Sequence, residues 1–399
     1  MLRGRLVEFW QRQAREIAED PALRAYGIAL CVGHLLAALF WVRMPLAEVL
    51  GPSAMPVCWP MFDGCAKWSR DGEFWQAVLL AYAALAALTG SLLGGKRAHW
   101  GVASFGLLFT VHLLVLFQDF RLRLNQHTML MWVGLVFLLA PSKRLSLRVL
   151  VVAFYLFAGL LKLDREWLSG AALGGHRPML VPQALVPAAC WYVVLLELGL
   201  VWGLFSRRRW LFWATLVQLG LFHLTSFSIV GFFYPLLMGA LLSIFVLDRR
   251  FPGDADRARW QHAALAVVPF GFLQLMPLMM PGDSALTGQG RFLALHMFDA
   301  KVACSATAKL RFADKPDEHV RLRTKLPARI ACDPLVYYHL ARGLCARQRA
   351  ADPRFMDLDL MLVSRRRTGP LVRVVDQPAF CTSPVSYSAW WPNAWINGR

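Results

Sequence analysis

Long runs of apolar residues, separated by short polar stretches, fill the chain up to about residue 280. Most runs reach about 18 residues, the length that an α-helix needs to cross roughly 30 Å of hydrocarbon. The fourth run is short, and the seventh and eighth nearly touch. The pattern predicts helices at about residues 26–42, 74–93, 99–117, 127–141, 146–163, 183–205, 209–224, 227–247 and 261–280. We therefore expect a mostly α-helical membrane bundle, the transmembrane domain 26–280, with eight or nine spans.

Residues 281–399 have a different character, because charged residues become frequent. The segments "RLRTKLPARI" (321–330) and "DLDLMLVSRRR" (357–367) alternate enough to predict strands. Between them, "DPLVYYHLARGLCARQRA" (333–350) has helical apolar spacing after an Asp-Pro start. We expect a small α+β domain here, large enough for a modest core of its own.

The composition agrees with a membrane protein, because 57% of the residues are hydrophobic and 17% are charged. The formal net charge of +18 does not indicate a nucleic-acid partner, since membrane proteins gather Lys and Arg in their loops. Residues 1–25 form a basic amphipathic segment that we expect to lie in the cytoplasm. Its pattern does not resemble a cleaved signal peptide, so the first apolar helix is expected to act as the insertion signal.

The basic residues also predict the orientation in the membrane. With the N-terminus in the cytoplasm, the loops on that side carry most of them, including Lys96, Arg97, Lys143, Arg144, Arg148, Arg207, Arg208, Arg209, Arg249 and Arg250. The opposite short loops hold fewer, namely Arg43, Lys67, Arg70, Arg121, Arg123, Arg165 and Arg177. We therefore expect a multi-pass protein of the inner (plasma) membrane, with residues 281–399 as an extracytoplasmic domain.

The cysteines support this orientation independently, because disulfides form in oxidising compartments. Cys31 and Cys190 lie in apolar segments. The others all fall in regions that the charge pattern places outside: Cys58, Cys65, Cys304, Cys332, Cys345 and Cys381. A metal site is the alternative, but these cysteines and their neighbours show no CxxC or HxxxH spacing, so we expect disulfides and no metal.

Several ionisable residues lie at membrane depth, where they are costly and indicate function by default. They are His34, His112, His127, Lys162, Glu197 and His223, with Asp119 just outside the third span. Each also has a purely structural interpretation: Lys162 could reach the interface with its flexible stem, and each histidine could be a satisfied hydrogen-bonding group. Glu197 lies in the middle of a helix, so we expect it to make an inward polar contact.

Three of these residues, Lys162, His127 and His223, are expected at the level of the outer leaflet. Their shared depth favours one common cavity. A lysine shielded from water can be neutral near pH 7 and act as a general base, while neighbouring imidazoles stabilise developing negative charge. A cavity within the bilayer would admit a lipophilic reductant.

The segment "YLFAGLLKLDREWLSG" (155–170) resembles the Ala-Gly-x-x-Lys-Leu-Asp-x-x-Trp-x-x-Gly segment of vitamin K-dependent gamma-glutamyl carboxylase and its bacterial relatives, the HTTM (horizontally transferred transmembrane) family. Further similar segments follow in the family's order: "CWPMFD" (58–63), "NQHTMLMWVGLVFLL" (125–139), "LVQLGLFHLTSFSIVGFFYPLLMGA" (216–240), "FLQLMPLMMPGDSALTGQGRF" (272–292), "DPLVYYHLARGLCARQ" (333–348) and "LVRVVDQPAFC" (371–381). The resemblance covers most of the chain, although the outer domain is much shorter than that of the vertebrate enzyme.

The resemblance implies an enzyme in which Lys162, uncharged, deprotonates a reduced quinone while His127 assists at the developing oxyanion. Reaction with O2 would then give a base strong enough to remove a γ-proton from a peptidyl glutamate, and the carbanion would take up CO2. The implied cofactors are reduced vitamin K or another membrane quinol, O2 and CO2, and the implied partners are the lipid bilayer and a peptide or protein substrate. The implied quinone-site residues are Asn125, Gln126, Tyr155, Trp167 and His223.

The resemblance also implies a disulfide between Cys58 and Cys345, which would tie the first outer loop to the outer domain. Cys65, Cys304, Cys332 and Cys381 would then pair in one of several ways.

The sequence departs from the family pattern at Gln126, where the family has a second Asn, and at Leu161, where it has a lysine. The family's Ser-Trp-Asp is replaced by residues 294–296, Ala-Leu-His. The alternative function is an HTTM-type membrane protein that matures or exports a secreted peptide toxin, without this chemistry. A solute transporter would need inverted repeats or paired discontinuous helices, and we see neither in the sequence.

Overall fold

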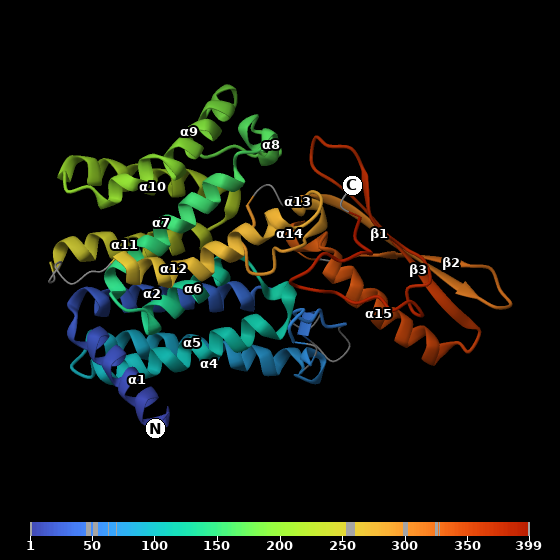
Figure 1. Cartoon of the computed structure of the whole chain (residues 1–399), viewed down its shortest axis with the longest axis horizontal. Helices are drawn as coiled ribbons and strands as arrows, with labels where there is room; N and C mark the ends of the chain where they lie inside the picture. Colours follow the sequence, from blue (N-terminus) through green and yellow to red (C-terminus); the bar gives the residue numbers. More distant parts are fainter. Residues whose placement is uncertain are drawn as a thin grey trace.

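The computed structural model describes residues 2–44, 49–50, 55–62, 64–68, 70–252, 260–297, 302–323, 326 and 328–397. It has two parts: a body of helices that run roughly side by side, and a C-terminal sheet that lies beyond one end of them (Figure 1). The α+β expectation for the C-terminal region and the mostly helical expectation for the rest are both confirmed.

The chain begins with α1 (Leu2–Glu19), which corresponds to the predicted amphipathic segment, and continues into α2 (Pro21–Val42). Asp20 separates the two helices, because its carboxylate accepts hydrogen bonds from the backbone N–H groups of Ala22 (2.8 Å) and Leu23 (3.0 Å). This N-cap, followed by Pro21, starts α2 five residues before the predicted position.

Each predicted apolar segment lies in helical structure. The helices are α4 (Gly72–Gly94), α5 (Ala98–Gln118), α6 (Asn125–Leu139), α7 (Lys143–Leu161), α9 (Val186–Leu198) flanked by the 3₁₀ turns η4 (Gln183–Leu185) and η5 (Leu200–Phe205), α10 (Arg209–Val230), α11 (Phe233–Arg250), and α12 (Trp260–Leu275) continued by η7 (Met276–Met279). Within the described ranges, seven helical stretches are long and apolar enough to cross a membrane. Two of the predicted spans are not among these seven: α6 is too short, and α11 carries charged residues at its C-terminal end. The nine-span count therefore stays a prediction.

Contacts between distant segments define the two ends of the helical body. At one end, Arg24 donates to the carbonyl of Leu93 (2.9 Å), and Arg144 forms an ion pair with Asp20 (2.6 Å). At the other end, the backbone N–H of Val57 donates to Asp119 (3.0 Å). Burial acts to raise the pKa of Asp119, and the paired guanidinium of Arg121 opposes that shift. The C-terminal part, which we call the outer domain after its expected side of the membrane, joins this second end (Figure 1).

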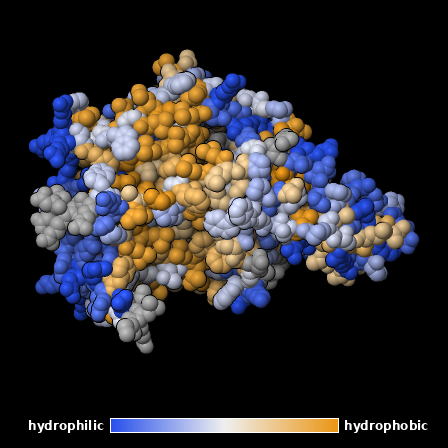
Figure 2. Space-filling model, viewed as in Figure 1, coloured by the Kyte–Doolittle hydropathy of each residue, from blue (hydrophilic) through white to orange (hydrophobic). Residues whose placement is uncertain are grey.

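The surface between the two ends is apolar (Figure 2). A wide hydrophobic band covers the flank of the helices, and hydrophilic residues border it on both sides. Large exposed apolar side chains on these helices include Leu80, Leu114, Val217, Leu265 and Val268. A band of this kind is stable in a lipid environment and would aggregate in water.

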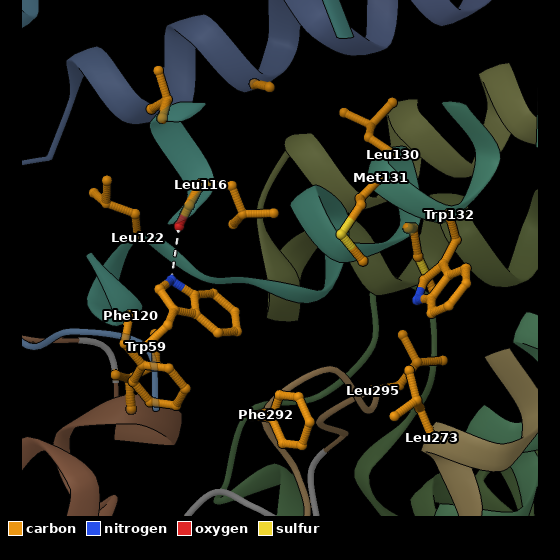
Figure 3. Packing of buried hydrophobic residues seen from close by; sticks show 14 of the residues in the cluster. Trp59, Leu116, Phe120, Leu122, Leu130, Met131, Trp132, Leu273, Phe292 and Leu295 are labelled. Carbon is orange, nitrogen blue, oxygen red and sulfur yellow. Dashed lines mark hydrogen bonds between the residues drawn. The ribbon is translucent and has the colours of Figure 1, made fainter. Parts of the chain in front are cut away.

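The outer end of the bundle is closed by segment 288–297, which follows α13 (Ser284–Thr287). Figure 3 shows its Phe292 and Leu295 in the same buried cluster as Trp59 and Trp132. The indole N–H of Trp59 donates to the carbonyl of Leu116 (3.0 Å), so the first outer loop is fastened to the end of α5. The junction is thus a continuous core that joins the helices to the outer domain.

The outer domain is a four-stranded antiparallel sheet with α15 (Pro334–Ala351) packed against it. The strand order is β2 (Glu318–Leu322), β1 (Ala303–Phe312), β3 (Phe355–Arg365) and β4 (Val372–Gln377). Ala306, Ala308 and Leu310 alternate along β1 as buried residues, which is the pattern of a sheet with one covered face.

The structure corrects one of the two predicted strands. The segment 357–367 lies mostly in β3, as expected. Of the described residues in 321–330, only Arg321 and Leu322 belong to a strand, and Ala328–Ala331 forms the short helix α14. Pro327 explains the error in part, because proline is poorly tolerated inside a strand and disrupts the ladder. The long strand β1 was missed, since its sequence alternates small and polar residues rather than large apolar ones.

Asp333 caps the start of α15, because its carboxylate accepts from the backbone N–H of Leu335 (3.0 Å). Burial raises the pKa of Asp333 to about 6. Because the pKa of Asp333 is higher in the folded protein than in the unfolded chain, the protonated carboxyl group contributes its full stabilisation below pH 4. This stabilisation is lost as the pH rises through about 6. Asp333→Asn keeps the cap and removes the ionisation.

We expect the wild-type protein to lose about 3 kcal/mol of unfolding free energy relative to Asp333→Asn between pH 4 and pH 7. Denaturant unfolding of the outer domain at a series of pH values measures this difference. Parallel stability curves for the two proteins would show that the buried carboxyl group does not titrate as described.

The disulfides differ from the expected pairing. Cys58 bonds to Cys65. Cys345 bonds to Cys381, and a third disulfide joins Cys304 to Cys332. The predicted pair Cys58–Cys345 is therefore wrong.

Local geometry explains this correction. The first outer loop does approach α15, since a side chain at Gly343 would collide with Met55. However, Cys58 has a nearer partner in its own loop, and Cys345 faces the segment after β4, with Cα atoms 5.8 Å apart in the Cys345–Cys381 pair.

Non-reducing peptide mapping should recover these three pairs. Replacing Cys345 and Cys381 by serine should lower the unfolding free energy by about 4 kcal/mol, because this disulfide closes a loop of 36 residues. The matched Cys58/Cys65 double serine variant should cost about 2 kcal/mol, since its loop has a separation of 7 residues. Recovery of a Cys58–Cys345 peptide would contradict the structure.

Candidate functional site

Lys162 lies where α7 ends. Its backbone N–H donates to the carbonyl of Gly159 (3.0 Å), and the chain then turns into the short helix α8 (Arg165–Leu168). Asp164 caps α8 by accepting from the backbone N–H of Glu166 (2.9 Å). The Lys162 side chain points into the protein and is 3% exposed, so it does not reach for water as an interfacial lysine would.

Gly159 allows α7 and α9 to approach closely at this level. A Cβ atom at Gly159 would lie 2.8 Å from the Leu198 side chain and 3.1 Å from the Cβ of Glu197. The glycine one turn before Lys162 therefore brings Glu197 within reach of the lysine. Any larger residue at position 159 would press on the Leu198 side chain and on the Cβ of Glu197.

The Lys162 amine bonds to both carboxylate oxygens of Glu197, at 2.6 Å and 2.5 Å. Glu197 is fully buried. Two opposite charges in a medium of low dielectric offset much of each other's desolvation cost, whereas removing one partner leaves a buried charge. The inward contact expected for Glu197 is thus made with the lysine itself.

A cavity of about 520 Å³ adjoins this pair. It lies among α6, the end of α7, the α8 segment, α9 and α10, and most of its wall is apolar. The residues that line it include Phe40, Lys162, Trp167, Leu173, Val181, Cys190, Val193, Leu221, Phe222, Ile229 and Tyr234. Its size is within the range of sites for drug-sized ligands.

The cavity reaches the apolar flank of the bundle between α9 and α10. Tyr192 of α9 donates a hydrogen bond to the Gln218 side chain of α10, and both residues line the cavity. Tyr192 is 43% exposed, and Leu221, one turn further along α10, is 55% exposed. An apolar molecule could therefore enter from the hydrophobic band without crossing water.

Three of the residues expected at the quinone site line the cavity: Asn125, Gln126 and Trp167. Trp167 places its ring 5.3 Å from the Lys162 amine and donates its indole N–H to the carbonyl of Cys190 (3.1 Å). Asn125 is occupied by segment 288–297, since its side chain oxygen accepts from the backbone N–H of His296 (2.7 Å). Within the described part of the chain, Gln126 is the cavity amide that remains for a ligand.

Tyr155 and His223 lie behind the cavity wall. The Tyr155 hydroxyl and the Nε2 atom of His223 are hydrogen-bonded at 2.6 Å, and both side chains are buried. The rings of Phe222 and Tyr234 separate His223 from the cavity and contact its imidazole. The two residues can therefore orient the wall, but they do not line the site.

His127 is not brought to Lys162. Its ring stacks on Trp41 with centroids 4.0 Å apart and meets Phe40 and Phe233 edge-on, and it is absent from the cavity lining within the described part of the chain. Phe40 and Gln126 stand at the cavity wall instead. The expectation that His127 shares the cavity with Lys162 is therefore not supported by the positions of the side chains.

The other membrane-depth histidines form a separate network. His34 Nδ1 and the Tyr82 hydroxyl are 2.5 Å apart, Tyr82 and His112 Nδ1 are 3.0 Å apart, and His112 Nε2 donates to the carbonyl of His127 (3.2 Å). The carbonyl can only accept, so a neutral His112 carries its proton on Nε2 and its Nδ1 accepts from the Tyr82 hydroxyl. The Tyr82 oxygen then accepts from the Nδ1–H of His34. This chain of bonds accounts for the burial of His34 and His112.

Sequence reasoning found Lys162, Glu197, Trp167 and Gln126, but it missed the ion pair and the cavity rim. The sequence feature that could have indicated the ion pair is that Lys162 and Glu197, of opposite charge, both lie in apolar segments. Among the described residues, no group of three His, Cys, Asp or Glu side chains is arranged to hold a metal ion. Comparisons of the chain with protein-family models, with curated proteins and with solved structures give no match.

Proposed function

We propose that the protein is an integral-membrane enzyme similar to the vitamin K-dependent gamma-carboxylases, in which Lys162 is the base. The observation that carries this proposal is a buried lysine, held by a buried glutamate, at the wall of an apolar cavity that opens toward the lipid-facing surface. An amine in such a place suits proton abstraction from a hydrophobic, weakly acidic substrate such as a quinol.

In this proposal Glu197 is the partner that allows Lys162 to act as a base. For Lys162 to act as the base, the ammonium first passes a proton to the carboxylate of Glu197, which leaves both members of the pair uncharged. The amine can then accept a proton from a substrate hydroxyl, while Glu197 keeps the Nζ atom directed at the cavity. The resulting ammonium is stabilised by the rings of Trp167 and Phe222, whose centroids lie 5.3 Å and 5.7 Å away.

The remaining polar groups of the cavity would orient the substrate. Gln126 can donate to or accept from a quinol oxygen, and the apolar wall formed by Leu221 and Ile229 suits the ring and a hydrocarbon tail. A reduced quinone, with O2, would supply the strong base that removes a γ-proton from peptidyl glutamate before CO2 adds. His127 would influence this site only through Phe40 and Gln126.

The proposed location is the plasma membrane, with the basic end of the bundle in the cytoplasm and the disulfide-bonded outer domain outside. The three disulfides support this orientation, because they require an oxidising compartment. The basic residues at the opposite end, including Arg207, Arg208 and Arg209, agree with it.

Comparative mass spectrometry of secreted peptides, from cells with and without the gene, tests the function. We expect glutamates that gain the mass of CO2 when the gene is present and not when Lys162 is replaced. A secreted peptide that is processed or exported in a gene-dependent way, but never carboxylated, would overturn the proposal in favour of a peptide-maturation role.

A further inference from the structure

The turn between β3 and β4 of the outer domain binds the chain directly after Lys162, through contacts of Arg366 and Thr368 that we call the clasp. Arg366 places its guanidinium between two aspartates: Nε and Nη2 bond to Asp283 at 2.5 Å and 2.9 Å, and Nη1 bonds to Asp164. Thr368 adds two hydrogen bonds to Glu166, from its backbone N–H (2.7 Å) and its hydroxyl (2.6 Å). The contacts of Arg366 with Asp164 and of Thr368 with Glu166 each join residues 202 positions apart in the chain.

The clasped residues and the lysine belong to one short segment with two faces. Lys162 and Trp167 turn inward to Glu197 and to the carbonyl of Cys190, whereas Asp164 and Glu166 turn outward to the β3–β4 turn. Asp164 also caps α8. A movement of the outward face therefore displaces the inward face, because fewer than two helical turns connect them.

Asp283 extends the clasp to a third part of the chain. It caps α13, since its carboxylate accepts from the backbone N–H of Ala285 (2.9 Å), and α13 follows directly from the last membrane helix. Burial acts to raise the pKa of Asp283, but the hydrogen bonds from Arg366 and from the backbone of Ala285, together with the charges of Arg366 and Arg291, outweigh it, so that the pKa lies below its usual value. Arg366 thus bonds to an Asp283 carboxylate that remains ionised near neutral pH.

A neighbouring contact shows how closely the turn fits. The backbone of Gly174 lies under the guanidinium of Arg367, where any Cβ atom would be 2.1 Å from a nitrogen. Gly174 follows Leu173, which lines the cavity. The β3–β4 turn therefore covers segment 164–174 along its length, from the lysine end to the part that forms the cavity wall.

We propose that Arg366 and Thr368 are positioning residues, through which the outer domain holds Lys162 at the cavity and completes the site. The inference rests on the proposed function for the reaction at Lys162, but not for the placement of the amine. Without the clasp, segment 162–167 would loosen, and the lysine would separate from Glu197 part of the time.

The test compares Arg366→Gln with Arg373→Gln in lipid nanodiscs. Arg373 is a matched control, because it is an exposed arginine of the adjoining strand β4 and its ion pair within the described residues is a local one, with Asp376 at 2.7 Å. The first readout is the rate at which a membrane-permeant succinimidyl ester modifies Lys162, followed by peptide mass spectrometry. The second is kcat and KM for quinol-dependent turnover.

Arg366→Gln should increase the modification rate of Lys162 by about tenfold and lower kcat by about 10- to 100-fold, with a smaller change in KM for the quinol. Thr368→Val should give an intermediate result, Arg366→Lys should restore part of the wild-type behaviour, and Arg373→Gln should match the wild type. Modification of partly exposed lysines of the sheet such as Lys309 should be equal in all variants.

Equal modification of Lys162 in Arg366→Gln and wild type would overturn the inference. If Arg366→Gln fails to fold, Thr368→Val carries the same comparison, since it removes one hydrogen bond and no charge. Faster modification of Lys162 in Arg366→Gln than in the wild type, together with no turnover by the wild type, would support the positioning role while contradicting the proposed function.

Discussion

Replacing Lys162 by methionine should reduce quinol-dependent turnover by about 1,000-fold, because the substitution removes the proton acceptor and keeps the volume of the side chain. The measurement is the turnover rate per folded molecule in nanodiscs supplied with reduced quinone. To avoid leaving Glu197 as an unpaired buried acid, the variant is best combined with Glu197→Gln, which keeps the shape of that side chain.

Lys143→Met is the matched control for this experiment. Lys143 is also a fully buried lysine, but it lies at the opposite end of the bundle, where its amine bonds to Gln13 and to the carbonyl of Ala140 (2.9 Å). This variant should lower stability and leave the turnover of the folded fraction within about twofold of wild type. A Lys162→Met protein that turns over as fast as Lys143→Met would show that Lys162 is not the base.

Removing Glu197 alone should destabilise the protein by about 3–5 kcal/mol, because Lys162 would then be a buried cation without its counterion. We expect a similar loss for Lys162→Met alone, and a much smaller one for the double variant Lys162→Met/Glu197→Leu, whose side chains are apolar and well matched in size. A double-mutant cycle, measured by thermal or denaturant unfolding in nanodiscs, isolates the coupling between the two residues.

The double-mutant cycle can also contradict the ion pair. If the two single losses add up in the double variant, the amine and the carboxylate do not interact, and the close approach of α7 to α9 at Gly159 has another cause. Gly159→Ala provides an independent check, since the added methyl group should separate the helices and lower turnover without altering any polar residue.

The sequence predicted the helices well, because an apolar run of about 18 residues has few alternatives in lipid. It could not predict how each helix is rotated about its axis. In α9, for example, apolar residues surround Glu197 on all sides, so the pattern does not indicate which face meets a neighbour. That rotation is set by close packing such as Gly159 against Leu198, which depends on the tertiary structure.

The same limit explains the errors at individual residues. His127 was assigned to the site by its expected depth and by the resemblance, and both are compatible with the other face of α6, where it stacks on Trp41. The pairing of Cys58 was assigned by resemblance, whereas the nearest cysteine in space is in its own loop. The clasp of Arg366 on Asp164 joins two domains, and no local pattern indicates such a contact.

The most direct test of the central claim needs no knowledge of the peptide substrate. Purified wild-type protein in nanodiscs, supplied with reduced vitamin K or another membrane quinol and with O2, is assayed for quinone epoxide by chromatography and mass spectrometry. Our account predicts enzyme-dependent epoxide with the wild type, and almost none with Lys162→Met/Glu197→Gln. Epoxide formation that is equal in both proteins, or absent from the wild type with every quinol supplied, would contradict it.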